Sequence, residues 1–502
     1  MKNKLKLYPI FIALIPLFFI THLAVEYWGS LNLSSLLLLY LIYAGSSVLL
    51  TYLLTLLIKT FWKSALMTVS LQILFFYFGS FHRFLKSIDM SGTFSRYSVL
   101  LPVVLILLLT YLIVTYRLKE KPKTFFLFLN SLFFLFILVD LLGMLEQVMK
   151  KNSQKITTIN ASKTEFESAD QPSIYLLVFD EYASSASLKE RFQFTNDLDT
   201  FLQQQGFRVI SNSKSNYNFT PFSIASLLNM SYLNGFQKHS ITAKDYQQTY
   251  ELIRKNNLVH QLKQSGYTII NRSIFDLAQE PAYTHSTFLP SGLWILRKQT
   301  FFHYLNQDLG WHLLKYNTVF KNVYLNAIME SKKSNLFLSK EIVKIAAEPK
   351  NKPVFVYAHF NMPHPPYYFD STGKERPEEQ IVKESRFQIN HPSNYLSYLR
   401  YTNASIQKMI TRILKHEQDK AVIVLIGDHG YRSHIEKNEH LFMNFNAIYL
   451  PRRYNNIPTP DRISLVNEFR FIINTLTNKQ SAFLPDSCII LKDQNPENAY
   501  KN

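Results

Sequence analysis

The stretch Ala421-Val-Ile-Val-Leu-Ile-Gly-Asp-His-Gly430 decides the fold, because an apolar run stops abruptly there on an aspartate, a histidine and a glycine. A short, β-branched and fully apolar run is typical of a buried strand in a parallel sheet. Since α/β proteins bind ligands at the carboxyl ends of such strands, we expect Asp428 and His429 at the mouth of a site. A carboxylate beside an imidazole suits zinc or manganese, but the same pair also serves as a helix cap, and these two residues alone leave both interpretations open.

A second stretch, Ser173-Ile-Tyr-Leu-Leu-Val-Phe-Asp-Glu-Tyr182, has the same form and ends on two acids. Asp180 and Glu181 are therefore expected at the same sheet edge as Asp428. We predict Asp180 as a metal ligand and keep Glu181 as an alternative, because either acid can cap the helix that follows. Helical segments alternate with such strands, which predicts an α/β domain with a doubly wound, mainly parallel sheet.

A helix start lies between these two strands, at Thr220-Pro-Phe-Ser223. We predict Thr220 as the N-cap and Pro221 as the next residue, where its missing N–H costs nothing. A hydroxyl at a helix N-terminus also lies beside free backbone N–H groups and the positive end of the dipole, which would hold a phosphoryl group. Thr220 is thus either a cap only or, beside a metal that lowers its pKa, a nucleophile, with Ser223 in reserve.

Candidate substrate contacts follow a third predicted strand, Pro353 to Phe360, and the Asp-His-Gly motif. His364 lies between prolines, so it projects from a stiff loop, where it either binds an oxyanion, protonates a leaving group or bonds to backbone. His359, within the strand, is interpreted as structural. Arg432 is expected to pair with a phosphate, and His440 either contacts substrate or lies in a solvated loop.

The first 150 residues are dominated by Leu, Phe, Ile and Tyr, unlike the rest of the chain. Five apolar stretches are each near or above the ~18 residues that cross ~30 Å of hydrocarbon as a helix. We therefore predict a transmembrane domain over residues 1–149, a polar linker over 150–172 and a second domain over 173–502. The predicted spans are Pro9 to Val25, Leu33 to Ile58, Ser64 to Phe81, Tyr97 to Tyr116 and Thr124 to Leu145.

The loops between these spans differ in cation content, which predicts orientation. Nine Lys and Arg residues precede the first span or join the second to the third and the fourth to the fifth, whereas the opposite loops hold only Arg83, Lys86 and Arg96. The N-terminus is therefore expected in the cytoplasm and the chain after Met149 outside it. The first span lacks a small-residue cleavage site, so we interpret it as a retained helix of a multi-pass plasma or inner membrane protein.

The net charge and the cysteine content restrict which partners and which kinds of site the protein can have. The chain carries 54 Lys and Arg against 36 Asp and Glu, a formal charge of +18. For an exported membrane protein this excess favours anionic lipid head groups over nucleic acid as partners. Its single cysteine, Cys488, excludes an internal disulfide and disfavours a cysteine-based metal site.

The order of these pieces resembles the alkaline phosphatase superfamily in its sulfatase-like branch, over most of Ser173 to Leu491. With five preceding helices, the chain looks similar to the membrane phosphotransferases of that branch, the phosphoethanolamine transferases of lipid A and the lipoteichoic acid synthases. The resemblance implies one zinc or manganese ion, with Thr220 as nucleophile and with His364 and His440 at the substrate. The metal ligands that it implies are Asp180, Thr220, Asp428 and His429.

Three departures from the family pattern restrict what the resemblance implies. Sulfatases need a Cys or Ser in a C/S-x-P-x-R motif, and Thr220-Pro-Phe-Ser223 has neither that residue nor the arginine, so sulfate-ester hydrolysis is disfavoured. The Asp-x-x-x-His motif of two-metal enzymes occurs only as Asp308 to His312, in a context that we interpret as structural, which favours one metal. The lipid A enzymes carry disulfides that this chain cannot form, so phosphoethanolamine itself is not implied.

The leading hypothesis is a phosphotransferase that moves a head group from a membrane phospholipid donor to a cell-surface lipid or glycan acceptor through a phospho-threonine intermediate. Hydrolysis of a phosphoester or sulfate ester is the alternative within the enzyme class. A membrane-anchored binding or assembly protein that has lost turnover is the alternative outside it.

Overall fold

The computed structural model describes residues 8–26, 33–89, 92–153, 171–235, 240–284, 296, 299–308, 325–326, 328–387, 391–432, 437–477 and 481–493. The chain forms two compact units, the first made of Met1–Thr157 and Pro290–Lys321, the second of Thr158–Leu289 and Asn322–Asn502. Residues 299–308, which the sequence analysis placed in the second domain, belong to the first unit together with the apolar helices. Most of the predicted linker, and His312, lie outside the described residues.

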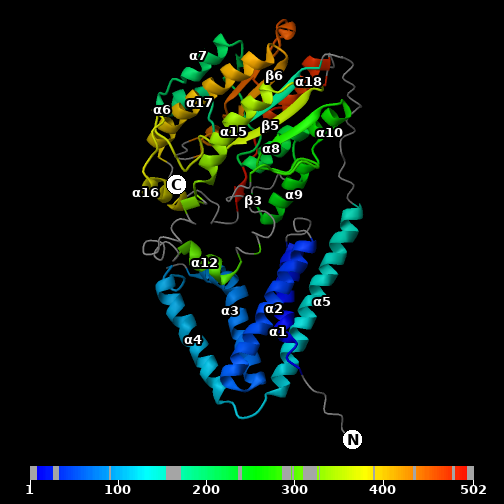
Figure 1. Cartoon of the computed structure of the whole chain (residues 1–502), viewed down its shortest axis with the longest axis vertical. Helices are drawn as coiled ribbons and strands as arrows, with labels where there is room; N and C mark the ends of the chain where they lie inside the picture. The colour runs from blue at the N-terminus through cyan, green and yellow to red at the C-terminus, as the bar shows by residue number, and fades with distance from the viewer. Residues whose placement is uncertain are drawn as a thin grey trace. The chain divides into compact units, whose positions relative to one another are not determined.

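The first unit contains five apolar helices at the positions predicted (Figure 1). Four of them have the length and composition to cross a membrane. The first has only 16 residues and contains Pro16, and at ~1.5 Å per residue it falls short of a ~30 Å hydrocarbon core. The helices are α1 (Phe11–Glu26), α2 (Leu33–Ile58), α3 (Phe61–Ile88), α4 (Tyr97–Arg117) and α5 (Lys123–Ser153).

Helix α1 lies at the centre of this unit, packed against α2, α3 and α5, and its Phe11 and Ile15 are fully buried. Helix α2, which packs on α1, and α4, which packs on α3, both expose many large apolar side chains, as expected of helices that face lipid. The later segment α12 (Phe301–Asp308) packs on α3 at Gly79, where an added Cβ would lie 2.2 Å from the Tyr304 ring. That close approach requires a glycine.

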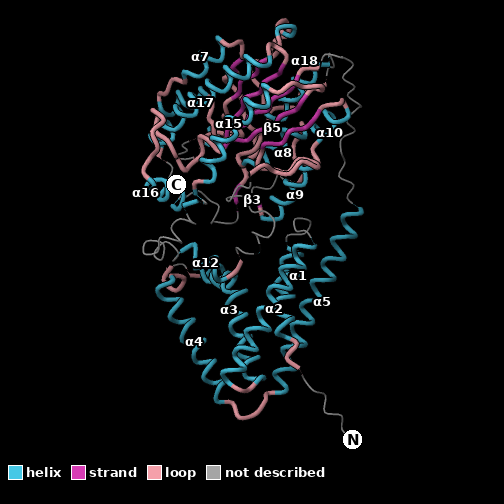
Figure 2. Tube along the Cα trace, viewed as in Figure 1, coloured by secondary structure: helices cyan, strands magenta, loops and turns pink. Residues whose placement is uncertain are grey.

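The second unit is built on a six-stranded sheet with the order β2-β7-β6-β1-β5-β4 (Figure 2). Strands β6, β1, β5 and β4 run parallel, and β7 pairs antiparallel with both β6 and β2. The prediction of a mainly parallel sheet is confirmed. The strands are β1 (Ser173–Phe179), β2 (Arg208–Val209), β4 (Thr268–Arg272), β5 (Val354–Phe360), β6 (Ala421–Gly427) and β7 (Asn446–Tyr449), and β3 (Ser240–Ile241) pairs separately with β8 (Lys492–Asp493).

Helices cover both faces of this sheet, as a doubly wound fold requires. Alternate residues of β1 point into two separate cores, with Ile174 and Leu176 in one and Tyr175 and Leu177 in the other. Both faces of the sheet are buried from solvent, which explains why the central strands are continuous apolar runs. The first core is closed by α8 (Thr220–Asn229), α9 (Ala243–Arg254), α10 (Asn257–Gln264) and α18 (Leu465–Thr477), the second by α6 (Ser185–Phe192), α7 (Asp197–Gln204), α15 (Glu330–Ala347), α16 (Glu378–Phe387) and α17 (Pro392–Glu417).

A buried polar chain links α18 to the end of β6. The Glu468 carboxylate accepts a hydrogen bond from Asn446 at 2.7 Å, and Asn446 also donates to Ser213 at 3.2 Å. Ser213 donates to Asn444, whose amide donates at 2.7 Å to the carbonyl of Gly427, the residue before Asp428. Burial raises the pKa of Glu468 to about 7, against a single opposing hydrogen bond from Asn446.

This buried acid predicts a pH-dependent stability. A carboxyl whose pKa rises from 4.5 to about 7 on folding contributes stability that is full below pH 4.5 and is lost as pH rises to 7. The loss amounts to about 3 kcal/mol. Glu468→Gln keeps a hydrogen-bond acceptor for Asn446 and removes the negative charge. The variant should therefore unfold at a higher denaturant concentration than the wild type at pH 8 and at the same concentration at pH 4.

The measurement is denaturant unfolding of the full chain in detergent at both pH values. Glu348→Gln, at an exposed position of the same unit, is the matched control and should change neither curve. Equal stability of Glu468→Gln and the wild type at pH 8 would contradict the prediction.

Candidate metal centre

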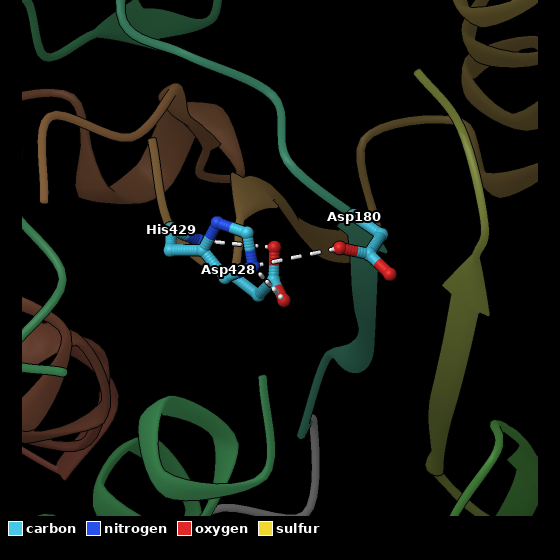
Figure 3. A group of neighbouring side chains, drawn as sticks. All are labelled: Asp180, Asp428 and His429. Atoms are coloured by element: carbon cyan, nitrogen blue, oxygen red, sulfur yellow. Dashed lines mark hydrogen bonds and ion pairs between the residues drawn. The ribbon is translucent and has the colours of Figure 1, made fainter. Parts of the chain in front are cut away.

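Three side chains meet at the carboxyl ends of β1 and β6 (Figure 3). The two strands pair in parallel with Phe179 opposite Gly427, so Asp180 and Asp428 leave the sheet at the same level. Together with His429 they offer ligand atoms that all lie within 4.8 Å of one another, and all three residues are fully buried. Among the described residues this is the one group of three or more acids, histidines or cysteines arranged to hold a metal ion.

The orientation of each group leaves its lone pairs directed into the cluster. His429 is held through Nδ1, 2.8 Å from the Gly430 carbonyl, so that Nε2 lies 3.6 Å from Asp180 Oδ1 and 3.4 Å from Asp428 Oδ2. Asp428 Oδ1 accepts the backbone N–H groups of Glu181 and His429, both at 2.9 Å. Both oxygens of Asp180 and Oδ2 of Asp428 are buried without a hydrogen-bond partner in the described part of the chain.

Such oxygens fit a cation, because burying unpaired carboxylate oxygens otherwise costs several kcal/mol. Burial, followed by the charge of Asp428, raises the pKa of Asp180. Burial also acts to raise the pKa of Asp428, but interactions with His429 and His359 and hydrogen bonds from Thr220 and the Glu181 backbone act in the opposite direction, and the net shift is downward. Burial lowers the pKa of His429 to about 4, so its ring is neutral and free to ligate. The donor set therefore fits one divalent metal.

Thr220 completes this cluster, at the first residue of α8. Its hydroxyl lies 3.4 Å from His429 Nε2, and the side chain is 4% exposed. The predicted N-cap was wrong by one position: Phe219, with extended backbone angles, is the N-cap, and Thr220 is already helical. The reason is that the threonine side chain faces the cluster and caps no backbone N–H. Asp180, Thr220, Asp428 and His429 are thus brought together.

The two glycines of the Gly-Asp-His-Gly stretch allow this loop to lie against other backbone. An added Cβ on Gly427 would come within 2.2 Å of the Tyr182 carbonyl oxygen, and one on Gly430 within 2.0 Å of the His440 carbonyl oxygen. No side chain fits at either position, so the glycines fix where Asp428 and His429 lie.

Arg432 and His364 form a second layer beside the cluster. Arg432 Nη2 lies 3.5 Å from His364 Nε2, and its charge acts on Asp180, Glu181 and His429. Burial, followed by Arg432, lowers the pKa of His364 to about 3, and its Nδ1 lies 2.6 Å from the Pro365 carbonyl. Nδ1 therefore carries the proton and Nε2 is an acceptor, which disfavours proton donation to a leaving group from Nε2.

Three predicted residues have other partners than a metal or substrate. Glu181 accepts the backbone N–H of Arg432 at 2.9 Å, and Ser223 donates its hydroxyl to the Asp428 carbonyl. The imidazole of His440 is directed to Ser187 Oγ at 3.0 Å and to Glu190 at 3.8 Å. The structure thus does not bring these three side chains into the metal cluster, and their assigned roles stay predictions.

The sequence analysis placed His359 in the correct strand but did not predict that it interacts with Asp428. It is buried on β5, with Nδ1 3.0 Å from the Tyr357 hydroxyl and Nε2 without a partner among the described residues. Burial lowers its pKa to about 4, and it interacts electrostatically with Asp428. The signal was the strand alternation, which places it on the same face as Phe355 and Tyr357.

Comparisons with known proteins were made after this geometry. The sequence profile of the family described as sulfatase matches residues 180–450. No curated protein sequence matches the chain.

Several solved structures are similar at low sequence identity. The integral membrane lipooligosaccharide phosphoethanolamine transferase A of Neisseria meningitidis matches over 93% of this chain and 95% of its own, at 11% identity and TM-score 0.37. The C-terminal periplasmic domain of EptC from Escherichia coli matches over 65% and 88%, at 13% identity and TM-score 0.35. A protein from a glycosaminoglycan-metabolism locus of Bacteroides thetaiotaomicron matches over 61% and 72%, at 14% identity and TM-score 0.38.

The cluster predicts a metal content that single substitutions remove. The purified full chain should hold about one zinc or manganese ion, and Asp180→Asn or Asp428→Asn should reduce it to near zero, because each removes a charged ligand. Metal at a hundredfold excess over its Kd should stabilise the wild type by about 2.7 kcal/mol. Elemental analysis and thermal unfolding measure both effects. As a control, His416→Ala, at an exposed position of α17, should keep the metal ion. Full metal content in both Asn variants would refute the site.

Proposed function

Because this chain belongs to the sulfatase family, we propose that it is a membrane-anchored, metal-dependent phosphotransferase. The family match spans residues 180–450 and includes all four clustered residues, and it confirms the resemblance to the sulfatase-like branch of the alkaline phosphatase superfamily. One observation carries the proposal: the Thr220 hydroxyl, at a helix N-terminus, lies against the buried carboxylates and imidazole. A threonine there cannot become the formylglycine of sulfatases, which favours phosphoryl over sulfate esters.

Asp180, Asp428, His429 and Thr220 would hold the metal ion. When bound, zinc or manganese supplies Lewis acidity, which favours ionisation of the Thr220 hydroxyl and neutralises charge on phosphate oxygens. The hydroxyl is carried by the first residue of α8, and the two carboxylates directly follow β1 and β6. Their geometry is therefore fixed by the packing of the sheet and not by a mobile loop.

Thr220 acts as the nucleophile in the first half of the reaction. Its Oγ1 attacks the phosphorus of a phospholipid in line, a new P–O bond forms, and the bond from phosphorus to the lipid oxygen breaks. The lipid leaves as diacylglycerol, with the proton that Thr220 gives up. Arg432, held by Glu181, binds a non-bridging phosphate oxygen.

The second half returns the enzyme to its starting state. An acceptor hydroxyl on a cell-surface lipid or glycan attacks the phospho-threonine phosphorus, and the P–O bond to Thr220 breaks, so that the hydroxyl is regenerated with the acceptor's proton. His364 Nε2, which bears a lone pair, is positioned beside Arg432 to accept a hydrogen bond from the incoming hydroxyl. The transferred group ends on the acceptor.

The apolar helices support a lipid donor. Four helices are long and apolar enough to cross a membrane, and a lipid substrate presents its head group at the membrane surface. By the positive-inside rule, the cations of the sequence favour a cytoplasmic N-terminus and a catalytic domain outside the cytoplasm.

Labelling of Thr220 tests this function. Metal-loaded protein incubated with phospholipid labelled in the head-group phosphate should gain a covalent label at Thr220, measured by mass spectrometry. Thr220→Ala should lose the label and at least about a thousandfold in turnover, because the nucleophile is gone, while Thr220→Ser should keep part of both.

Ser226→Ala is the matched control, since it removes another buried hydroxyl of α8 that donates only to a backbone carbonyl. Turnover in Thr220→Ala equal to that of the wild type would contradict the proposal. Label released to water in the presence of acceptor lipids and glycans would instead assign a hydrolase.

A further inference from the structure

A pocket lies between α15 and α17, which pack side by side in the second unit (Figure 1). It has a volume of about 230 Å³. Its lining contains four cationic side chains and no acidic one, and none of the four clustered residues of the metal centre contributes to it. The cations are Lys332, Lys340, Lys408 and Arg412.

Three aromatic rings and two methionines form much of the remaining lining, which is completed by Asn335, Leu336, Ser339, Val343 and Ser405. Tyr401 stacks on Phe369 with ring centroids 4.3 Å apart and lies parallel to Tyr398 at 5.7 Å. These contacts hold the rings in fixed positions, and Met362 and Met409 add an apolar surface that adapts to shape. The pocket therefore combines a rigid apolar wall with a cationic rim.

Three of the four cations have no acidic partner in the described part of the chain. Lys332 pairs with Glu375 at 2.7 Å and lies over the Phe369 ring. Lys340, Lys408 and Arg412 make no ion pair with any residue that the structure describes. Like charges gathered around one cavity repel one another, and an anion bound among them removes that repulsion.

We propose that this pocket binds a small organic phosphate, with its oxygens at Lys340, Lys408 and Arg412 and its carbon body on the aromatic wall. Guanidinium and ammonium groups are the usual protein ligands of phosphate, and the rings exclude water from the body of the ligand. The volume lies below the ~300–1,000 Å³ of drug-sized sites, so one head group or one short ester fits.

The pocket is a site in addition to the metal centre, although the two share one segment. Met362 lines the pocket two residues before His364, and Asn335, also in the lining, exchanges hydrogen bonds with the Asn361 backbone at 3.1 and 2.9 Å. The ligand thus contacts the segment that carries His364 without contacting the metal ligands. Binding here does not require turnover at Thr220.

Phenylphosphonate is the probe, since it carries the anion and an apolar ring and cannot be hydrolysed at an ester bond. Titrated calorimetrically into the full chain in detergent with the Asp428→Ala substitution, which removes the metal centre, it should bind at one site per chain. Lys340→Gln, Lys408→Gln and Arg412→Gln together should weaken binding by about tenfold or more, because three charge contacts are lost. Benzyl alcohol, which lacks the anion, should bind far more weakly than the phosphonate.

The control triple, Lys333→Gln, Lys344→Gln and Lys415→Gln, removes the same charge from exposed positions of the same two helices outside the pocket and should leave the Kd unchanged. Competition by glycerol 3-phosphate or by short-chain phosphatidic acid identifies a free ester or a lipid head group as the source. Binding that disappears with Asp428→Ala alone, or that the pocket triple leaves intact, overturns the proposal. Loss of Thr220 labelling would not affect this measurement, so the two proposals fail separately.

Discussion

The parallel pairing of β1 with β6 is the constraint on which the site depends. It places Asp180 and Asp428 at one level of a sheet edge, both fully buried, with His429 turned toward them. Two carboxylates at this distance without a cation are unfavourable, and the packed cores on both faces of the sheet hold them there. The fold therefore uses its hydrophobic energy to maintain a binding site for a positive ion.

The strands and their ends were predictable because the physics that makes them is local. Uninterrupted apolar runs such as Ala421–Gly427 mark strands covered on both faces, and an acid directly after each run marks the ligand edge. The start of α8 was predicted to within one residue. The sequence could not show that Thr220 faces a cluster instead of a cap, because that depends on the distance between β6 and α8 in the folded chain.

Other features were beyond the sequence because they arise from tertiary contacts. In the sequence His359 is an ordinary strand residue. Its interaction with Asp428, almost 70 residues later in the chain, becomes visible only in the folded structure. The fit of Tyr304 against Gly79, which joins α12 to the apolar helices, has no local signature at either position. The spacing also could not show that Glu181, kept as an alternative metal ligand, accepts a hydrogen bond from the backbone N–H of Arg432.

Anomalous X-ray scattering from crystals grown with zinc would test the central claim most directly. The account predicts one strong peak about 2.0–2.2 Å from the side-chain atoms of Asp180, Asp428 and His429, with the Thr220 oxygen as the remaining protein ligand. A crystal with zinc bound elsewhere and no peak between these side chains would contradict it.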